Sequence, residues 1–181
     1  MHSLSRLVLA ACLVAGTALA GPAETGTLEP CLDESQLQRA VEQLNALRRQ
    51  PAPCAPASSA MQRLSWESRL AASATEQARD IAQQDRLSHT DSRNRGLGTR
   101  LRSVGYAAAG AGENLAAGQT DIDDAFAAWL ASPSHCANLM QPEYSDVGLA
   151  CVQRRGSRYE RFWVAHFGAP AGPSATTTAR R

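Results

Sequence analysis

Apolar residues recur at helical spacing through the first two thirds of the chain and alternate near its end. Segment 33–49 predicts a helix, because Asp33 and Gln36 form a capping-box pattern at its start. Its apolar face consists of Leu37, Val41, Leu44 and Leu47. Pro51 then ends the helix, and a loop rich in proline, alanine and serine follows.

Three further helices are predicted before residue 132. The first spans 66–85 and is rich in alanine, which favours close packing against another element. A short helix capped by Thr99 ends at Gly105, and segment 107–112 reads as a flexible turn. Another helix starts with a capping-box-like pair at Thr120 and Asp123. Its core-facing residues are Ile122, Phe126, Trp129 and Leu130.

The end of the chain changes to strand patterns. Ser132 followed by Pro133 predicts the start of one last short helix. Segments 147–152 and 159–167 then predict two strands joined by a turn at 154–157. Alternation places His166 on the face of Phe162 and Val164. The predicted class is therefore α+β, with helices first and an antiparallel sheet late.

Composition narrows the class of protein. At 181 residues and 44% hydrophobic residues, the chain is long enough for one globular domain. Its formal net charge is +1, and every basic residue is arginine. No run of five like charges occurs, so a nucleic-acid partner is not expected.

Residues 1–20 have the parts of a secretory signal peptide. Arg6 is followed by a short apolar segment and by an A-x-A cleavage site at 18–20. A membrane anchor and lipidation at Cys12 are the alternatives. We expect a spacer at 21–30, one domain at 31–168 and a disordered tail at 169–181. The predicted location is extracellular or periplasmic.

Four cysteines remain after cleavage: Cys31, Cys54, Cys136 and Cys151. In an oxidising compartment two disulfides are the default, and four cysteines allow three pairings. Zinc is the competing interpretation, but the sequence has no C-x-x-C pair.

Three histidines and one glutamate are the candidates for chemistry. His89, His135 and Glu113 could form a three-ligand zinc site with an open position, or a hydrogen-bonded polar cluster. We expect the glycine-flanked Glu113 to lie in a loop that exposes its carboxylate. His166 is interpreted as a strand histidine with a hydrogen-bond partner.

A nucleophilic site is the alternative to metal chemistry. Ser132 or Ser134 could act as nucleophile, with His135 or His89 as base and Glu113 as orienting group. The G-x-S-x-G pattern is missing, and Ser132 has a sufficient role as a helix cap. Asn114 is expected to satisfy backbone groups beside the site.

Seven short segments, in this order, together resemble one known family. They are 64–66, 87–90, 102–106, 112–116, 129–140, 147–150 and 162–164. The set resembles the CAP superfamily (cysteine-rich secretory, antigen 5 and pathogenesis-related proteins), also called the SCP domain, in its secreted bacterial branch. The likeness covers about residues 35–168.

The resemblance implies an α-β-α sandwich with a central antiparallel sheet, and a cleft where His89, Glu113 and His135 meet. The family's second glutamate is replaced by Ser132, which removes one carboxylate; Asp124 is a candidate substitute. The resemblance also favours the pairs Cys54–Cys136 and Cys31–Cys151. The runner-up pairing is Cys31–Cys54 with Cys136–Cys151.

Family membership leaves the activity open. The first expectation is a monomeric binding module for a lipid, peptide or cell-wall component. An apolar groove beside Leu139 and Met140 would favour a lipid. The second is a hydrolase or protease with zinc or another divalent metal on His89, Glu113 and His135. Loss of the carboxylate at Ser132 argues against hydrolysis, because no general base is left. The third is a structural protein of the cell envelope.

Overall fold

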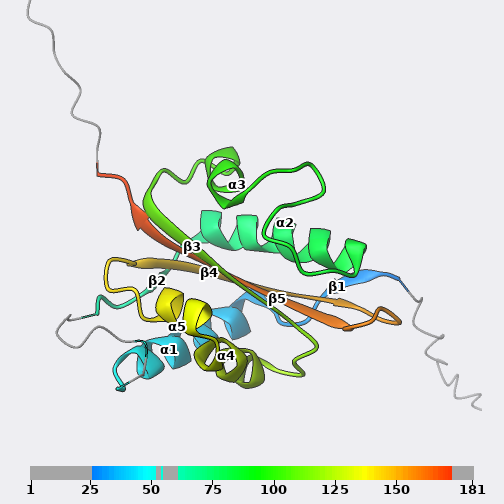
Figure 1. The fold of residues 1–181 in the computed structure, drawn as a ribbon, viewed down its shortest axis with the longest axis horizontal. Helices are drawn as coiled ribbons and strands as arrows, with labels where there is room; N and C mark the ends of the chain where they lie inside the picture. The colour runs from blue at the N-terminus through cyan, green and yellow to red at the C-terminus, as the bar shows by residue number, and fades with distance from the viewer. Residues whose placement is uncertain (1–25, 52–53, 55–60, 173–181) are drawn as a thin grey trace, which may run out of the picture.

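A sheet of three long strands and two short ones organises the molecule (Figure 1). The structure is a computed structural model and describes residues 26–51, 54 and 61–172. Its elements are β1 (Leu28–Pro30), α1 (Glu34–Arg48), β2 (Ser65–Trp66), α2 (Ser68–Gln84), α3 (Leu97–Ser103), β3 (Ala108–Ala117), α4 (Ile122–Ala131), α5 (Pro133–Leu139), β4 (Asp146–Arg154) and β5 (Arg161–Pro170). The strand order is β1-β4-β5-β3, and β2 pairs with β4 in parallel while the other pairs are antiparallel.

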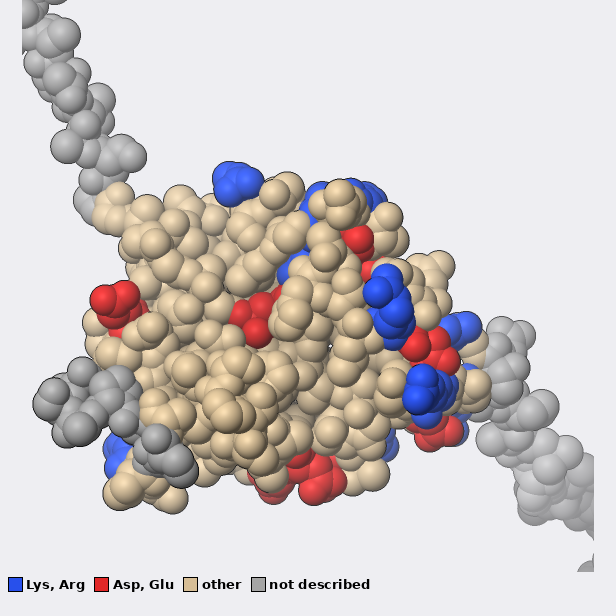
Figure 2. All heavy atoms as spheres, viewed as in Figure 1, with Lys and Arg blue, Asp and Glu red and all other residues tan. Residues whose placement is uncertain are grey.

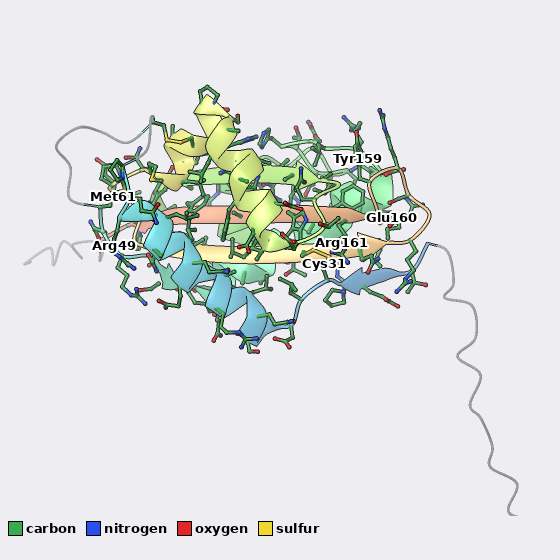
Figure 3. All side chains as sticks on the ribbon, turned by 90° about the horizontal axis from the view of Figure 1, so that it is seen from below. Cys31, Arg49, Met61, Tyr159, Glu160 and Arg161 are labelled. Atoms are coloured by element: carbon green, nitrogen blue, oxygen red, sulfur yellow. A yellow bond between two sulfur atoms is a disulfide. The ribbon has the colours of Figure 1, made fainter. Side chains whose placement is uncertain are left out.

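Helices cover both faces of the sheet. In Figure 1, α2 and α3 lie on one side, and α1, α4 and α5 lie on the other. Alternation along β5 builds a core on each side: Phe162 and Val164 pack with α2, whereas Trp163 and Phe167 join the core of α1, α4 and α5. Figure 3, viewed from below, shows α1 and α4 crossing the sheet. The predicted α-β-α sandwich is confirmed.

Close packing of α2 depends on one glycine. A Cβ atom on Gly148 of β4 would lie 2.0 Å from the backbone nitrogen of Ala71 in α2. No side chain fits there, so this glycine allows the alanine-rich helix to lie directly on the sheet. The close packing predicted from the alanines is confirmed.

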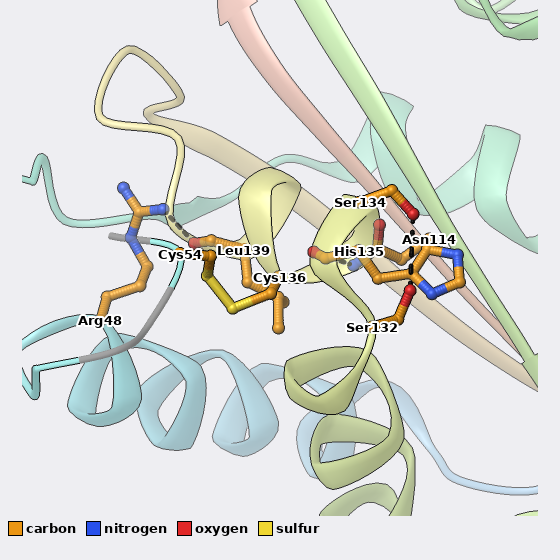
Figure 4. The surroundings of a disulfide bond; sticks show 8 residues. All are labelled: Arg48, Cys54, Asn114, Ser132, Ser134, His135, Cys136 and Leu139. Atoms are coloured by element: carbon orange, nitrogen blue, oxygen red, sulfur yellow. Dashed lines mark hydrogen bonds between the residues drawn. A yellow bond between two sulfur atoms is a disulfide. The ribbon is translucent and has the colours of Figure 1, made fainter. Parts of the chain in front are cut away.

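Both preferred disulfides are present. Cys31 is bonded to Cys151 with a Cα–Cα distance of 5.2 Å, and Cys54 is bonded to Cys136 at 5.9 Å. The first joins the segment before α1 to β4, and the second joins the segment after α1 to α5 (Figure 4). The runner-up pairing is therefore wrong.

Helix starts are only partly as predicted. Asp33 caps α1 with the full capping box, because it accepts from the Gln36 amide and the Gln36 side chain accepts from the Asp33 amide. The caps at Thr99 and Thr120 are wrong. The N-cap residue is Gly96 in α3 and Asp121 in α4, since each has the extended backbone that an N-cap requires.

Three segments predicted as irregular contain strand residues. The turn expected at 107–112 is instead the start of β3, because it pairs with β5. The expected spacer ends in β1, where Leu28 lies opposite Arg154. The expected tail is wrong at its start, since Ala169 and Pro170 continue β5.

The signal peptide, the lipidation alternative at Cys12 and residues 173–181 lie outside the described residues. Within the part of the chain that the structure describes, none of the helices has the length and apolar character needed to span a membrane.

Candidate functional site

Glu113 is the centre of the candidate site, and its first partner comes from the neighbouring strand. The register of β3 and β5 places Glu113 directly opposite His166, so both side chains lie on the same face of the sheet. Nε2 of His166 lies 2.8 Å from Oε2 of Glu113. Burial lowers the pKa of His166, and its Nδ1 has no partner among the described residues. Because the Glu113 carboxylate can only accept, Nε2 of His166 donates this bond, and His166 is the predicted strand histidine with a hydrogen-bond partner.

A buried arginine from α3 supplies the positive charge. The Arg100 side chain is fully buried, and its Nη2 donates to Oε2 of Glu113. Its Nη1 donates to the carbonyl oxygens of His89 at 3.1 Å and Arg95 at 3.0 Å. One guanidinium thus neutralises the carboxylate and also fixes the loop that carries His89.

His89 is the exposed end of the cluster. Its Nδ1 lies 2.7 Å from Oε1 of Glu113, while 64% of its side chain is exposed. The hydrogen bond to Glu113 raises the pKa of His89, against the effect of partial burial. Its ring therefore links the buried carboxylate to the surface. In Figure 2, acidic atoms with basic atoms beside them lie in a hollow near the middle of one face.

Glu113 does not lie in a loop. It belongs to β3 and is 7% exposed, so the prediction of an exposed carboxylate is wrong. Burial raises the pKa of a carboxyl group, but hydrogen bonds from His166 and His89 and the charge of Arg100 lower that of Glu113 to about 2. Both of its oxygens are occupied by these partners.

The backbone of His135 in α5 lies on the side of β3 opposite to Glu113. Alternation turns Asn114, the next residue, toward α5, where its Nδ2 donates to the His135 carbonyl at 2.9 Å. Figure 4 shows the His135 ring beside Ser132 and Ser134, pointing away from the disulfide of Cys136. Burial and the nearby charge of His89 lower the pKa of His135. The two imidazoles are thus neighbours, but no hydrogen bond joins His135 to Glu113 in the described residues.

Asn138 completes the α5 side of the site. Its Nδ2 donates to Oδ1 of Asn114 at 2.9 Å and to the Glu113 carbonyl at 3.2 Å. The expectation that Asn114 satisfies backbone groups is confirmed by its bond to the His135 carbonyl. Together the two amides attach α5 to β3.

The donor set does not fit the expected metal. Glu113 already shares its oxygens with Arg100, His166 and His89. A divalent cation there would face a buried guanidinium of the same charge sign, and His135 is outside the hydrogen-bonded cluster. In the described part of the chain, no three His, Cys, Asp or Glu side chains are arranged to hold an ion.

The other candidate residues have structural surroundings. Ser132 is at the N-cap position of α5, as predicted, but its Oγ lies 3.4 Å from that of Ser134 instead of capping the helix. Among the described residues, neither hydroxyl bonds to a histidine, as a nucleophile would require. Asp124, the candidate substitute, accepts a hydrogen bond from Thr120 at the start of α4.

Leu139 and Met140 do not line an exposed groove, which is the observation that would have favoured a lipid ligand. These side chains are 0% and 2% exposed and belong to the core below the sheet. This support for a lipid ligand is therefore not found at Leu139 and Met140.

Sequence reasoning missed Arg100. Arg100 lies in a short helix, 13 residues before Glu113. Because the chain has no lysine and every Lys/Arg position is arginine, an arginine at this position did not stand out as a candidate site residue. Its neighbour Leu101 is apolar, which indicates that this helix packs inward, and the structure shows that Leu101 is buried.

A family model described as "Cysteine-rich secretory protein family" (CAP) matches residues 41–167, which is more than half of the chain. No curated protein matches this chain. An extracellular protein containing an SCP domain from Bacillus anthracis is similar in structure, with TM-score 0.59 and 25% identity. That match covers 74% of this chain and 40% of the Bacillus protein, so this chain spans less than half of that relative.

Two other solved structures share the fold. An outer surface protein of Borrelia burgdorferi has TM-score 0.64 and 19% identity, covering 81% of this chain and 99% of that protein. A cysteine-rich secretory protein of Staphylococcus aureus has TM-score 0.57 and 16% identity, and the match covers 75% of this chain and 38% of that protein. The fold is thus found both as a whole protein and as part of a longer one.

Proposed function

The chain belongs to the CAP family of cysteine-rich secretory proteins, and from this premise we propose that it is an exported binding module whose cleft at Glu113 binds a polar ligand without a metal. Export is supported by its two disulfides, by the predicted signal peptide and by the extracellular relatives. As in the sequence analysis, we expect the protein to act as a monomer.

One observation carries the proposal: every oxygen of Glu113 is already paired. The buried carboxylate balances Arg100 and orients His89, so its role is to hold the exposed imidazole in place. Nδ1 of His89 is used by Glu113, which leaves Nε2 for a ligand. With its raised pKa, His89 favours the imidazolium form, which donates a hydrogen bond from Nε2.

The ligand that suits this cleft carries acceptor oxygens. A carboxylate or an acetamido carbonyl would accept from His89; peptides supply the carboxylate, whereas cell-wall glycopeptides supply both groups. We therefore favour a cell-wall fragment as the ligand class. Its binding should strengthen below the pKa of His89, because the imidazolium is the donor.

The test uses soluble peptidoglycan fragments and the ring resonances of His89 in NMR. Saturable shifts at His89, lost in His89→Ala and kept in Thr90→Ala, are expected. Thr90 is the matched control, since it is exposed and adjacent. Shifts that persist in His89→Ala, or no shifts at all, would overturn the proposal. The latter outcome would favour the structural envelope role.

The hydrolase alternative is tested by calorimetry with Zn²⁺ and Cu²⁺. Because Arg100 occupies the carboxylate, we expect no one-to-one binding that depends on both His89 and Glu113. Tight binding lost in both His89→Ala and Glu113→Gln would support the metal-dependent enzyme instead, and peptide hydrolysis would then be assayed.

A second candidate function is acyl-chain binding at another place. A groove of about 350 Å³ lies between α1 and α4 and is lined by Leu47, Phe126, Ala127 and Leu130, among others. Its apolar walls suit a hydrocarbon chain. Displacement of a fluorescent fatty acid, abolished by Ala127→Trp, would support a lipid ligand there.

A further inference from the structure

The outer edge of β4 is only partly covered by other strands. β1 pairs with residues 152–154 of β4, and β2 pairs with residues 146–147. Between them the chain leaves the sheet twice, because Asp33 caps α1 and Glu67 caps α2. A stretch of β4 from Gly148 to Cys151 is therefore without a strand partner on this side.

The backbone of Leu149 faces this uncovered edge. Arg154 donates its N–H to the Glu160 carbonyl, so the even-numbered residues of β4 bond to β5. Odd-numbered residues face away from β5. The Val147 carbonyl accepts from the Glu67 amide at 2.9 Å, and the Cys151 carbonyl accepts from the Cys31 amide at 3.0 Å. Leu149 thus directs both its N–H and its C=O outward, and neither has a hydrogen-bond partner among the described residues.

A groove lies directly over this edge. It has a volume of about 320 Å³, and its walls come from the start of α1, from α2 and from β4. We call it the edge groove; it includes Leu32, Leu37, Trp66, Ala72 and Leu149. The indole N–H of Trp66 is buried and also has no partner in the described part of the chain. The groove therefore combines apolar walls with hydrogen-bonding groups that need partners.

The charge at the rim indicates what kind of partner fits. Glu34 and Arg79 are the charged side chains that line the edge groove. Glu34 accepts a hydrogen bond from Gln38, whereas Arg79 makes no ion pair or hydrogen bond with another described residue. An acidic group on a ligand would complement Arg79.

We propose that the edge groove binds an extended peptide segment, which pairs its backbone with Leu149, places an apolar side chain beside Trp66 and directs an acidic side chain toward Arg79. A peptide strand offers both an N–H and a C=O at one residue, as Leu149 requires. An acyl chain has no N–H or C=O along its length to pair with the backbone of Leu149. The uncovered stretch of four residues, about 13 Å long, limits the paired segment to a few residues.

The experiment titrates acetyl-Ala-Val-Asp-Val-Ala-amide into the isotope-labelled protein and follows amide resonances by NMR. Saturable shifts are expected at the Leu149 amide and the Trp66 indole. Two further peptides carry N-methyl groups on alternate residues, one set on the even and one on the odd positions. In an added strand only one set faces β4, so one peptide should lose at least tenfold in affinity while the other keeps it.

Three variants locate the site. Ala72→Trp, an exposed position on α2, should block binding, and Ala131→Trp, an exposed position at the end of α4 that lines neither groove, is its matched control. Arg79→Glu should weaken the aspartate peptide more than its asparagine counterpart. Equal binding of both N-methylated peptides, unchanged binding by Ala72→Trp, or no shift up to 10 mM peptide would overturn the proposal. Decanoate producing the same shifts in place of the peptide would assign the edge groove to an acyl chain instead.

Discussion

Arg48 and Arg100 are both buried, at 4% and 0% exposure, but they are paired in opposite ways. Arg48 of α1 donates to backbone carbonyls, among them that of Leu139, which Figure 4 shows, and that of Gln62. Arg100 of α3 shares its charge with the carboxylate of Glu113. One region of the molecule therefore balances a buried cation with dipoles, and the other balances it with an anion.

The difference separates a structural arginine from one at a functional site. Leu139 is the last residue of α5, where helix carbonyls carry partial negative charge, so Arg48 stabilises the end of that helix. Burial lowers the pKa of Arg48, and no titratable group in the described residues pairs with it. The stability of the Arg100 region, in contrast, depends on the ionisation of Glu113.

The largest effect is expected when the ion pair loses one member. Arg100→Met should destabilise the fold by about 3–5 kcal/mol, because the Glu113 carboxylate stays buried without its counter-ion. Urea unfolding measures the change. The double variant Arg100→Met/Glu113→Gln removes both charges and should be less destabilised than the sum of the singles; additive costs would contradict the pairing.

The second largest effect is expected from acid, which should lower the free energy of unfolding by protonating Glu113. The pKa of Glu113 is lowered from 4.5 to about 2, so its contribution is complete above pH 4.5 and is lost as the pH falls toward 2. At about 1.4 kcal/mol per pH unit, the loss reaches about 3 kcal/mol. Unfolding in urea between pH 6 and pH 2.5 should show a flatter profile for Glu113→Gln than for the parent chain. Parallel profiles would disprove the assignment.

A smaller loss is expected at the structural arginine. Arg48→Met should cost about 2 kcal/mol, because buried carbonyls around α5 lose their donor. This cost should not change between pH 6 and pH 4, since no carboxylate is involved. The same urea series at both pH values provides the measurement, and a pH-dependent cost would show that Arg48 is coupled to an acid.

The smallest effect is expected at an exposed pair. Arg63 contacts Glu42, and both side chains are more than half exposed. Arg63→Ala should change stability by less than about 1 kcal/mol, because solvent screens the pair. A loss of stability as large as that of Arg48→Met would mean that burial does not determine how much each arginine contributes to stability.

Local signals predicted the elements better than the contacts between them. The Asp33–Gln36 capping box and the faces of β5 depend on neighbouring residues, and they were predicted correctly. Segment 107–112 was predicted as a turn because its small residues have no strand preference. It is a strand only because β5 pairs with it, which is a contact about 60 residues away.

The candidate site shows the same limit. His89 and Glu113 were predicted to meet, and a hydrogen bond joins them. His135 does not join the bonded cluster, because alternation along β3 turns Glu113 to one face and Asn114 to the other. Arg100 and the pairing of Glu113 with His166 follow from sheet register and helix packing, which no local pattern in the sequence expresses.

The two disulfides are nested, and this has a consequence for the order in which the chain becomes oxidised. In the export from the N-terminus that we propose, Cys31 and Cys54 would reach the oxidising compartment before their native partners, and they are only 23 residues apart. Their native partners follow 120 and 82 residues later in sequence. The first bond that the emerging chain can form is thus a non-native one, and thiol–disulfide exchange must break it. A host that supplies a disulfide isomerase will therefore yield more correctly bonded protein than one that supplies an oxidant alone.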